Sequence, residues 1–181
     1  MANKIGRVLI GIVIVVAVFV VIWLVLPGQY KNPILATYQS KTNDNYDDLV
    51  GTIQKSLVLK NKKHTYEDMM LSATGNPSWT IEELAVDDNG DGSYWVYADG
   101  YKTTVSFENE ENSDGMITFT NAHVRLAFNV TKEGKDIKIG NKVIEPDKQI
   151  GPDHIEVATA TYNSSTDASY YQAVLDALCG D

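Results

Sequence analysis

The strongest hydrophobic pattern in the chain is an uninterrupted apolar run near the N-terminus. Residues 8–26 are 19 consecutive residues without a charged or polar side chain. As an α-helix they would span roughly 28 Å, close to the ~30 Å hydrocarbon core of a bilayer. A cleavable signal peptide has a shorter apolar stretch and small residues at its cleavage site, whereas this run ends in Leu26 and Pro27. We therefore predict an uncleaved transmembrane anchor over residues 8–26.

Basic residues beside this run predict its orientation. Lys4 and Arg7 precede the apolar residues, and only Lys31 and Lys41 follow them closely. Positive charge is retained on the cytoplasmic side of a membrane. We therefore expect residues 1–7 in the cytoplasm, a single pass through the inner (plasma) membrane, and everything that follows on the extracytoplasmic side.

The next segment has no sustained apolar periodicity. Residues 27–41 include Pro27 and Pro33, which favour irregular structure. Trp23 and Tyr30 lie where an interfacial aromatic belt would be expected at the outer leaflet. We therefore predict a stalk over residues 27–41 that lifts a folded domain, residues 42–181, away from the bilayer.

Helical periodicity marks the start of this domain. One apolar face follows the candidate N-cap residues 43–45 and consists of Tyr46, Leu49, Val50, Ile53 and Leu57. A second helix begins after Thr65, which with Asp68 approximates a capping box, and it ends before Gly75. Two short helices therefore precede every predicted strand.

From Trp79 onward the apolar period changes to two, which is typical of antiparallel strands. Residues 79–86 form the first predicted strand. The strands 94–98 and 101–107 are separated only by Asp99 and Gly100. Because Asp-Gly is a preferred dipeptide of the type I′ turn, we predict a two-residue hairpin at this point.

The remaining pattern predicts further strands and a final helix. Residues 117–131 alternate, with His123 and Arg125 on the polar side, but the parity changes near Asn121 and requires a bulge. Short strands are predicted over residues 137–139, 142–144 and 155–162. A C-terminal helix is predicted from one apolar stripe, formed by Tyr171, Val174, Leu175 and Leu178.

Together these elements predict an α+β fold: an N-terminal transmembrane helix, then two short helices packed on an antiparallel β-meander, with a C-terminal helix. This order, with the motif Asn76-Pro77-Ser78-Trp79, resembles the small periplasmic domains of the β-lactamase-inhibitor-like and outer-membrane-assembly-lipoprotein (SmpA/OmlA) type, over residues 42–144. The resemblance implies a non-enzymatic binding or scaffolding module. The chain departs from that type in its transmembrane helix, which replaces a lipid anchor, and in its C-terminal strand and helix.

The charge of the chain restricts its partners. The formal net charge is −9, and because residues 1–30 contain only Lys4 and Arg7 as charges, the remainder carries −11. A body this acidic repels phosphate backbones, so we expect no nucleic-acid partner. Residues 82–114 hold ten acidic groups and one basic group, with Glu108, Glu110 and Glu111 in the loop that follows the predicted hairpin. If the predicted hairpins stack, these groups gather at one end of the sheet. This acidic end either steers a basic protein partner or only keeps the domain soluble.

One segment has the spacing of a calcium-binding loop. Asp87, Asn89 and Asp91 occupy positions 1, 3 and 5 of such a loop, but position 12, where a bidentate glutamate belongs, is Ala98. The segment is therefore either a weak calcium site or, as we favour, a polar turn between two strands. No other feature indicates a metal or a cofactor, and we predict none.

Large aromatic residues provide the other interaction candidates. Trp95 and Tyr97 share one face of a predicted strand, and that face forms a protein-binding patch unless the C-terminal helix covers it. Cys179 is the single cysteine, so a disulfide could form only with another chain, and a dimer is one outcome.

The sequence lacks the common catalytic motifs, including Gly-x-Ser-x-Gly, His-Glu-x-x-His and Cys-x-x-Cys. We therefore predict a membrane-anchored extracytoplasmic binding or scaffolding module without catalytic activity. Two alternatives stay open: a subunit of a larger envelope assembly, such as secretion or pilus machinery, and an enzyme that uses surface carboxylates.

Overall fold

A computed structural model describes residues 13, 16–61, 63–108, 115–145, 147–160, 163–165 and 170–180. The fold is α+β, as predicted. In chain order its elements are α2 (Gly28–Thr42), α3 (Tyr46–Lys55), β1 (Leu57–Val58), α4 (Tyr66–Thr74), β2 (Ser78–Val86), β3 (Gly92–Glu108), β4 (Met116–Glu133), β5 (Asp136–Ile139), β6 (Lys142–Val143), β7 (Gln149–Ile150), β8 (His154–Ala158), β9 (Asn163–Ser165) and α5 (Tyr171–Cys179).

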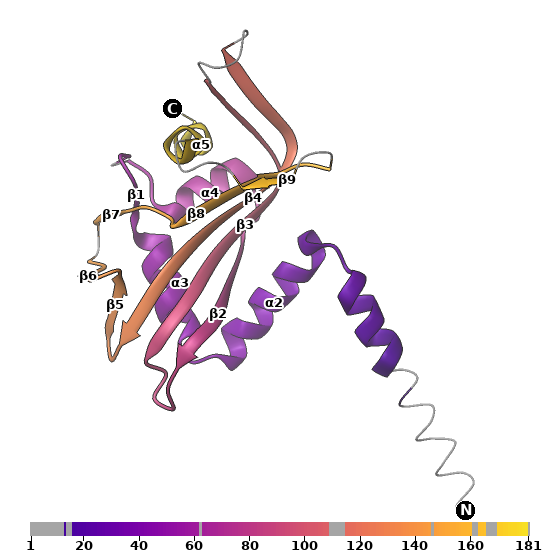
Figure 1. Cartoon of the computed structure of the whole chain (residues 1–181), viewed down its shortest axis with the longest axis vertical. Helices are drawn as coiled ribbons and strands as arrows, with labels where there is room; N and C mark the ends of the chain where they lie inside the picture. Colours follow the sequence, from indigo (N-terminus) through magenta and orange to yellow (C-terminus); the bar gives the residue numbers. More distant parts are fainter. Residues whose placement is uncertain are drawn as a thin grey trace, which may run out of the picture.

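The main sheet is antiparallel and is built around the long strands β3 and β4. Strand β2 pairs with β3, and β3 pairs with β4. On its other edge, the C-terminal end of β4 pairs with β5, which carries β6, and the middle of β4 pairs with β8, which carries β9. The short strands β1 and β7 form a separate parallel pair. Figure 1 shows β3 and β4 continuing as a two-stranded arm above the body of the sheet.

The hydrophobic core lies between one face of the sheet and the helices α3, α4 and α5. The predicted apolar faces of these helices are buried, which confirms the helical periodicity in the sequence. The exception is Leu57, which was predicted on the first of these faces and lies in β1. At the start of α4, the backbone N–H of Asp68 donates to Thr65 Oγ1 at 3.2 Å, so the predicted N-cap is present. In the core, the rings of Tyr66 and Phe128 meet edge to face with their centroids 4.9 Å apart.

The predicted hairpin at Asp99 and Gly100 is wrong, because β3 runs without interruption from Gly92 to Glu108. Asp99 pairs with Arg125 across the β3–β4 ladder, and its side chain is fully buried. Gly100 does not have the positive φ that a type I′ turn requires. A β-carbon at Gly100 would lie 2.1 Å from Thr74 Cγ2, so glycine is needed for the close approach of α4 and not for a turn.

The predicted irregularity near Asn121 is confirmed. Asn121 has a φ of 53°, and on the facing strand Lys102 has a φ of 60°, where the β3–β4 register shifts. The shift changes which alternate positions face the core. Val124 and Leu126 are therefore buried after it, and Ile117, before it, still packs partly against the same core.

Residues 27–41 were predicted to form an irregular stalk, but residues 28–42 form the regular helix α2, which packs along β2. Gln39 holds the helix to the outer edge of this strand. Its Nε2 donates to the carbonyl oxygen of Ile81 at 2.7 Å, and the N–H of Ile81 donates to Gln39 Oε1 at 3.0 Å. The side chain therefore satisfies backbone groups that an edge strand would otherwise expose for pairing with another chain.

The C-terminal part agrees with the prediction except around β8. Strand β8 ends at Ala158, earlier than expected, and residues 163–165 pair with it as β9. Helix α5 is present as predicted, with Val174, Leu175 and Leu178 buried.

The transmembrane anchor stays a prediction. Within the described residues, no single helix is long and apolar enough to cross a membrane. The helix Val16–Val25 and α2 meet the length and composition requirement only as a pair, and they are bent by 117° relative to each other. Most of residues 1–15, including the beginning of the predicted anchor, lie outside the described residues.

Candidate interaction site

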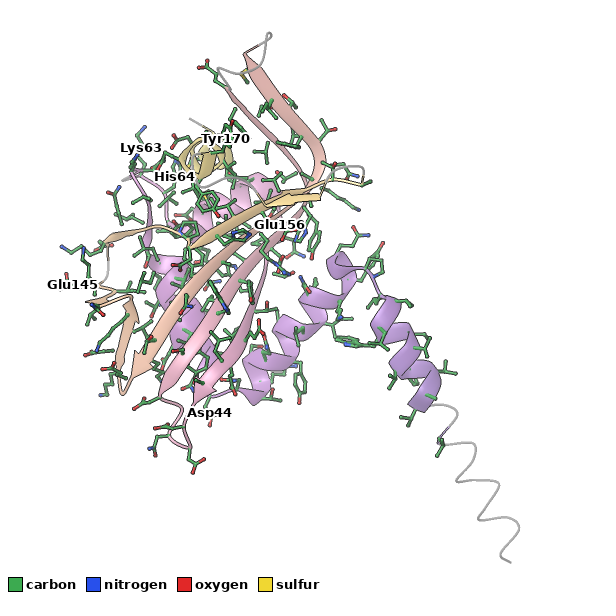
Figure 2. The ribbon with its side chains drawn as sticks, viewed as in Figure 1. Asp44, Lys63, His64, Glu145, Glu156 and Tyr170 are labelled. Atoms are coloured by element: carbon green, nitrogen blue, oxygen red, sulfur yellow. The ribbon has the colours of Figure 1, made fainter. Side chains whose placement is uncertain are left out.

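The face of the sheet opposite α3, α4 and α5 carries the candidate site. Strand alternation places there Glu82, Trp95, Tyr97, Asp99, Tyr101, His123, Arg125 and Glu156, which together we call the outer face. Figure 1 shows α3 and α4 behind the strands and α2 at the β2 edge of this face. Figure 2 shows Glu156 on β8 at the same face. The C-terminal helix packs into the core and leaves Trp95 and Tyr97 partly exposed.

The aromatic half of the outer face is held in one arrangement. The rings of Trp95 and Tyr97 stack with centroids 6.2 Å apart and an interplanar angle of 20°. The Arg125 guanidinium carbon lies 5.0 Å from the Tyr97 ring centroid, a cation–π arrangement. The Tyr97 hydroxyl donates to Glu82 Oε2 at 2.7 Å. Burial and the neighbouring Glu82 carboxylate raise the pKa of Tyr97 to about 12, so its hydroxyl stays protonated and can keep donating.

Next to the aromatic pair lies a polar group around the fully buried Asp99, which we call the Asp99 cluster. It is formed by Asn32, Asp99, Tyr101, His123 and Arg125. The Oδ1 atom of Asp99 contacts His123 Nε2 at 2.6 Å and Arg125 Nε at 2.8 Å. Its Oδ2 atom accepts from Asn32 Nδ2 at 2.9 Å and from Arg125 Nη2 at 3.1 Å. A carboxylate can accept about four hydrogen bonds, and all are made here.

These contacts also indicate which atoms of the cluster donate hydrogen bonds and which accept them. A charged Asp99 can only accept, so His123 donates from Nε2, and in a neutral ring the lone pair is then on Nδ1. The second hydrogen of Asn32 Nδ2 goes to the Tyr101 hydroxyl oxygen at 2.8 Å. The Tyr101 ring in turn stacks on His123, with centroids 4.4 Å apart and an angle of 7°.

The charge of Asp99 affects the pKa values of two neighbouring groups, the Arg125 guanidinium and the Tyr101 phenol. Burial would lower the pKa of Arg125, but the hydrogen bonds and charge of Asp99 outweigh burial and raise it above the ordinary value. Burial, followed by the charge of Asp99, raises the pKa of Tyr101. Arg125 therefore stays charged and Tyr101 stays neutral at physiological pH.

An aspartate that holds a histidine in one tautomer is also found in enzymes, where it orients a general base. In this chain, no serine, threonine or cysteine among the described residues hydrogen-bonds to His123. The observed contacts of the Asp99 cluster connect β3, β4 and α2. Through Arg125 they also hold the ring of Tyr97 in the aromatic pair.

The structure separates the acidic residues that the sequence placed at one end of the sheet. The Asp87–Asp91 loop lies at one end of β3 and Glu108 lies at the other, because β3 is continuous. Asp99 is buried and neutralised by Arg125, so it adds no surface charge. Glu110 and Glu111 lie outside the described residues. The expectation of a single acidic end is therefore wrong for the part of the acidic stretch that the structure describes.

The calcium candidates form the turn between β2 and β3. Asp87 Oδ1 accepts the backbone N–H groups of Asn89 and Asp91 at 2.8 and 3.0 Å, which makes an Asx-type turn. Asp91 Oδ1 accepts the N–H of Gly134 at 2.7 Å. The described residues contain no group of three or more acidic, histidine or cysteine side chains placed to hold a metal ion. These oxygens already accept hydrogen bonds from backbone N–H groups, with which a calcium ion would have to compete.

We predict that calcium leaves stability nearly unchanged. With a Kd of about 10⁻⁴ M or weaker, 0.1 mM calcium would stabilise the fold by at most roughly 0.4 kcal/mol. Thermal melts in chelator and in 0.1 mM calcium should therefore coincide, for the natural sequence and for the double variant Asp87→Ala, Asp91→Ala. A rise of several degrees in calcium that the double variant abolishes would establish a calcium site and contradict the turn interpretation.

Cys179, the candidate for an interchain disulfide, lies in the last turn of α5 and is partly buried against the core. A covalent dimer through this thiol stays a prediction.

No protein-family model, no curated protein and no solved structure matches this chain. The resemblance to the periplasmic lipoprotein-type domains therefore stays a prediction.

Sequence reasoning found Trp95 and Tyr97 but missed the Asp99 cluster. The signal was present, because His123 and Arg125 alternate on the polar side of one predicted strand. Asp99 continues the polar alternation of Trp95 and Tyr97. The Asp-Gly dipeptide was interpreted as a turn, and this removed Asp99 from the strand.

Proposed function

We propose that this chain is a membrane-anchored extracytoplasmic module that binds or scaffolds another protein through the outer face and has no catalytic activity. The observation that carries this proposal is the partly exposed Trp95–Tyr97 pair, fixed by Glu82 and Arg125 on a face that α3, α4 and α5 leave open. Tryptophan, tyrosine and arginine are the residues most enriched at the energetic centres of protein interfaces.

Preorganisation supports the same proposal. An aromatic side chain that must be ordered on binding loses conformational entropy, and the cost is smaller when its rotamer is already fixed. Tyr97 is fixed by a hydrogen bond at its hydroxyl and by Arg125 over its ring. Arg125 is itself fixed by the buried Asp99. The partner would thus bind to side chains that are already held in one conformation.

The expected partner is a protein with basic groups near its contact surface. Glu82 and Glu156 lie on the outer face, and the exposed turn Asp87–Asp91 lies at the end of the same strands. Combined with the net charge of −11 outside residues 1–30, these groups would increase the rate of encounter with a positively charged surface.

The test is site-specific photocrosslinking of the full-length chain in its native membrane. A photoreactive residue in place of Glu156 on the outer face should crosslink one defined partner, and the same residue in place of exposed Glu67 on α4 should not. Trp95→Ala should weaken binding of the crosslinked partner by about 1–2 kcal/mol, or roughly 5- to 30-fold. Equal crosslinking from both faces, or an unchanged affinity, would contradict the proposal.

A second candidate is a subunit of a larger envelope assembly. The arm formed by the outer halves of β3 and β4 favours it, since the arm extends beyond the body of the sheet and carries the exposed Met116 at its far end. Purification in detergent distinguishes the two candidates: a subunit should copurify with stoichiometric membrane partners, whereas a separate binding module should be recovered mostly alone.

A further inference from the structure

Helix α2 has a row of large side chains that faces away from the domain. Tyr30, Ile34 and Tyr38 are spaced four residues apart, so they lie on one side of the helix. Their exposed fractions are 56, 52 and 63 %. We call these three residues the α2 stripe.

The opposite side of the helix is already occupied by the domain. Asn32 is buried and donates to Asp99 and to the Tyr101 hydroxyl oxygen, and Gln39 pairs with the backbone of β2. The orientation of α2 about its own axis is therefore fixed by polar contacts, and the α2 stripe is directed away from the sheet as a consequence. Figure 1 shows α2 between the sheet and the helix Val16–Val25 that precedes it.

The position of α2 along the chain identifies what this stripe meets. The predicted membrane anchor ends at Leu26, and α2 begins at Gly28. The helix Val16–Val25 and α2 are bent by 117°, and Lys31 Nζ lies 5.7 Å from the Trp23 ring centroid across this bend. If Val16–Val25 runs through the bilayer, the bend takes α2 to within roughly 30° of the membrane plane, and a helix tilt of about 20° removes most of the difference.

The charge of α2 fits a lipid surface and differs from that of the rest of the domain. Its 15 residues include Lys31 and Lys41 and no acidic residue, in a chain whose net charge is −9. Lysine near anionic headgroups is attracted to them, and tyrosine prefers the boundary between headgroups and acyl chains. The acidic body is repelled by the same surface, so α2 is the part that can make contact.

We infer that α2 is a membrane-interface helix, with Tyr30, Ile34 and Tyr38 inserted at the boundary between the headgroups and acyl chains of the outer leaflet. The inference depends on the membrane anchor of the proposed function. In this arrangement α2 connects the membrane and the domain rigidly, because it contacts lipid on one side and is hydrogen-bonded to the Asp99 cluster on the other. The sheet is then held at a fixed orientation and close to the membrane, which limits the partners of the outer face to those at the same surface.

The experiment measures the depth of single labelled positions in the full-length chain. Cys179→Ser provides a background without cysteine. An environment-sensitive fluorophore is attached at Ile34→Cys or Tyr38→Cys in the α2 stripe, at Val18→Cys in the anchor, or at Glu67→Cys on exposed α4. The labelled proteins are reconstituted in vesicles of phosphatidylcholine and phosphatidylglycerol, with acyl chains brominated at either a shallow or a deep position.

The expected result is a blue-shifted emission at positions 34 and 38 that is lost mainly with shallow bromines, consistent with a depth of about 5–10 Å. Position 18 should be quenched most by deep bromines, and position 67 by neither. If position 18 is quenched but positions 34 and 38 are no more quenched than position 67, the interface helix is overturned and the membrane anchor remains. Unquenched emission at 18 would instead reject the anchor, and the inference with it. Tyr38→Glu, at an exposed position that leaves the fold intact, should reduce the quenching at 34, and unchanged quenching would also overturn the inference.

Discussion

Asp99→Asn is expected to lower the free energy of unfolding by about 3 kcal/mol, which corresponds to a fall in Tm of roughly 6–12 °C for a domain of this size. The substitution keeps the shape of the side chain and removes its charge, so Arg125 loses its counterion and His123 loses a carboxylate hydrogen-bond partner. Arg125 and His123 are 33 and 26 % exposed, so water compensates part of the loss, and the effect is below the upper limit for a buried ion pair. Chemical or thermal unfolding of the full-length protein, followed by circular dichroism, measures the change.

This substitution also discriminates between the observed strand and the hairpin that the sequence favoured. Asn-Gly is the most favourable dipeptide of a type I′ turn, so Asp99→Asn at a hairpin would leave stability unchanged or raise it. The matched control is Asp88→Asn at an exposed position in the β2–β3 turn, where the change should stay within about 0.5 kcal/mol. Equal effects of the two substitutions would contradict the buried cluster.

Gly100→Ala should destabilise the fold by about 2–3 kcal/mol, because the added methyl group would overlap Thr74 Cγ2, 2.1 Å away. Replacing Thr74 by the smaller alanine should relieve the overlap. The double variant Gly100→Ala, Thr74→Ala should therefore be more stable than the sum of the two single changes predicts, and the coupling free energy from a double-mutant cycle of unfolding measurements is the readout.

A glycine without such a neighbour provides the control. Gly51 lies within α3, and a β-carbon there would meet no atom within 4 Å. Gly51→Ala should stabilise the protein by up to about 1 kcal/mol, since alanine favours helix and restricts the unfolded chain. If Gly100→Ala destabilises without any coupling to Thr74, its cost comes from the backbone conformation, and the close approach of α4 to β3 is not its cause.

The two variants test different parts of the proposed function. Asp99 fixes Arg125, which in turn lies over Tyr97, so Asp99→Asn should disturb the aromatic pair as well as stability. Gly100→Ala acts from the core side through α4. A loss of partner binding with Asp99→Asn that Gly100→Ala does not share, at equal loss of stability, would indicate that the outer face itself makes the contact.

The sequence by itself determined the elements whose signals are local. The apolar periodicity of α3, α4 and α5, the Thr65 cap and the alternation in β2 and β4 depend on residues within a few positions of one another. Such patterns specify which face is buried regardless of the partner element. The bulge near Asn121 was also determined in this way, because two sets of apolar residues of opposite parity must enter one core.

Only the tertiary structure decided the meaning of Asp99-Gly100 and of residues 28–42. An Asp-Gly pair favours a turn when its side chain is free, but Asn32, His123 and Arg125 lie 67, 24 and 26 residues away and together supply the hydrogen bonds that hold Asp99 in a strand. Likewise, α2 has weak periodicity because polar Asn32 and Gln39 face the domain while the α2 stripe faces outward. Contacts between residues distant in sequence outweigh local propensity at these positions, and a pattern limited to neighbouring residues does not contain them.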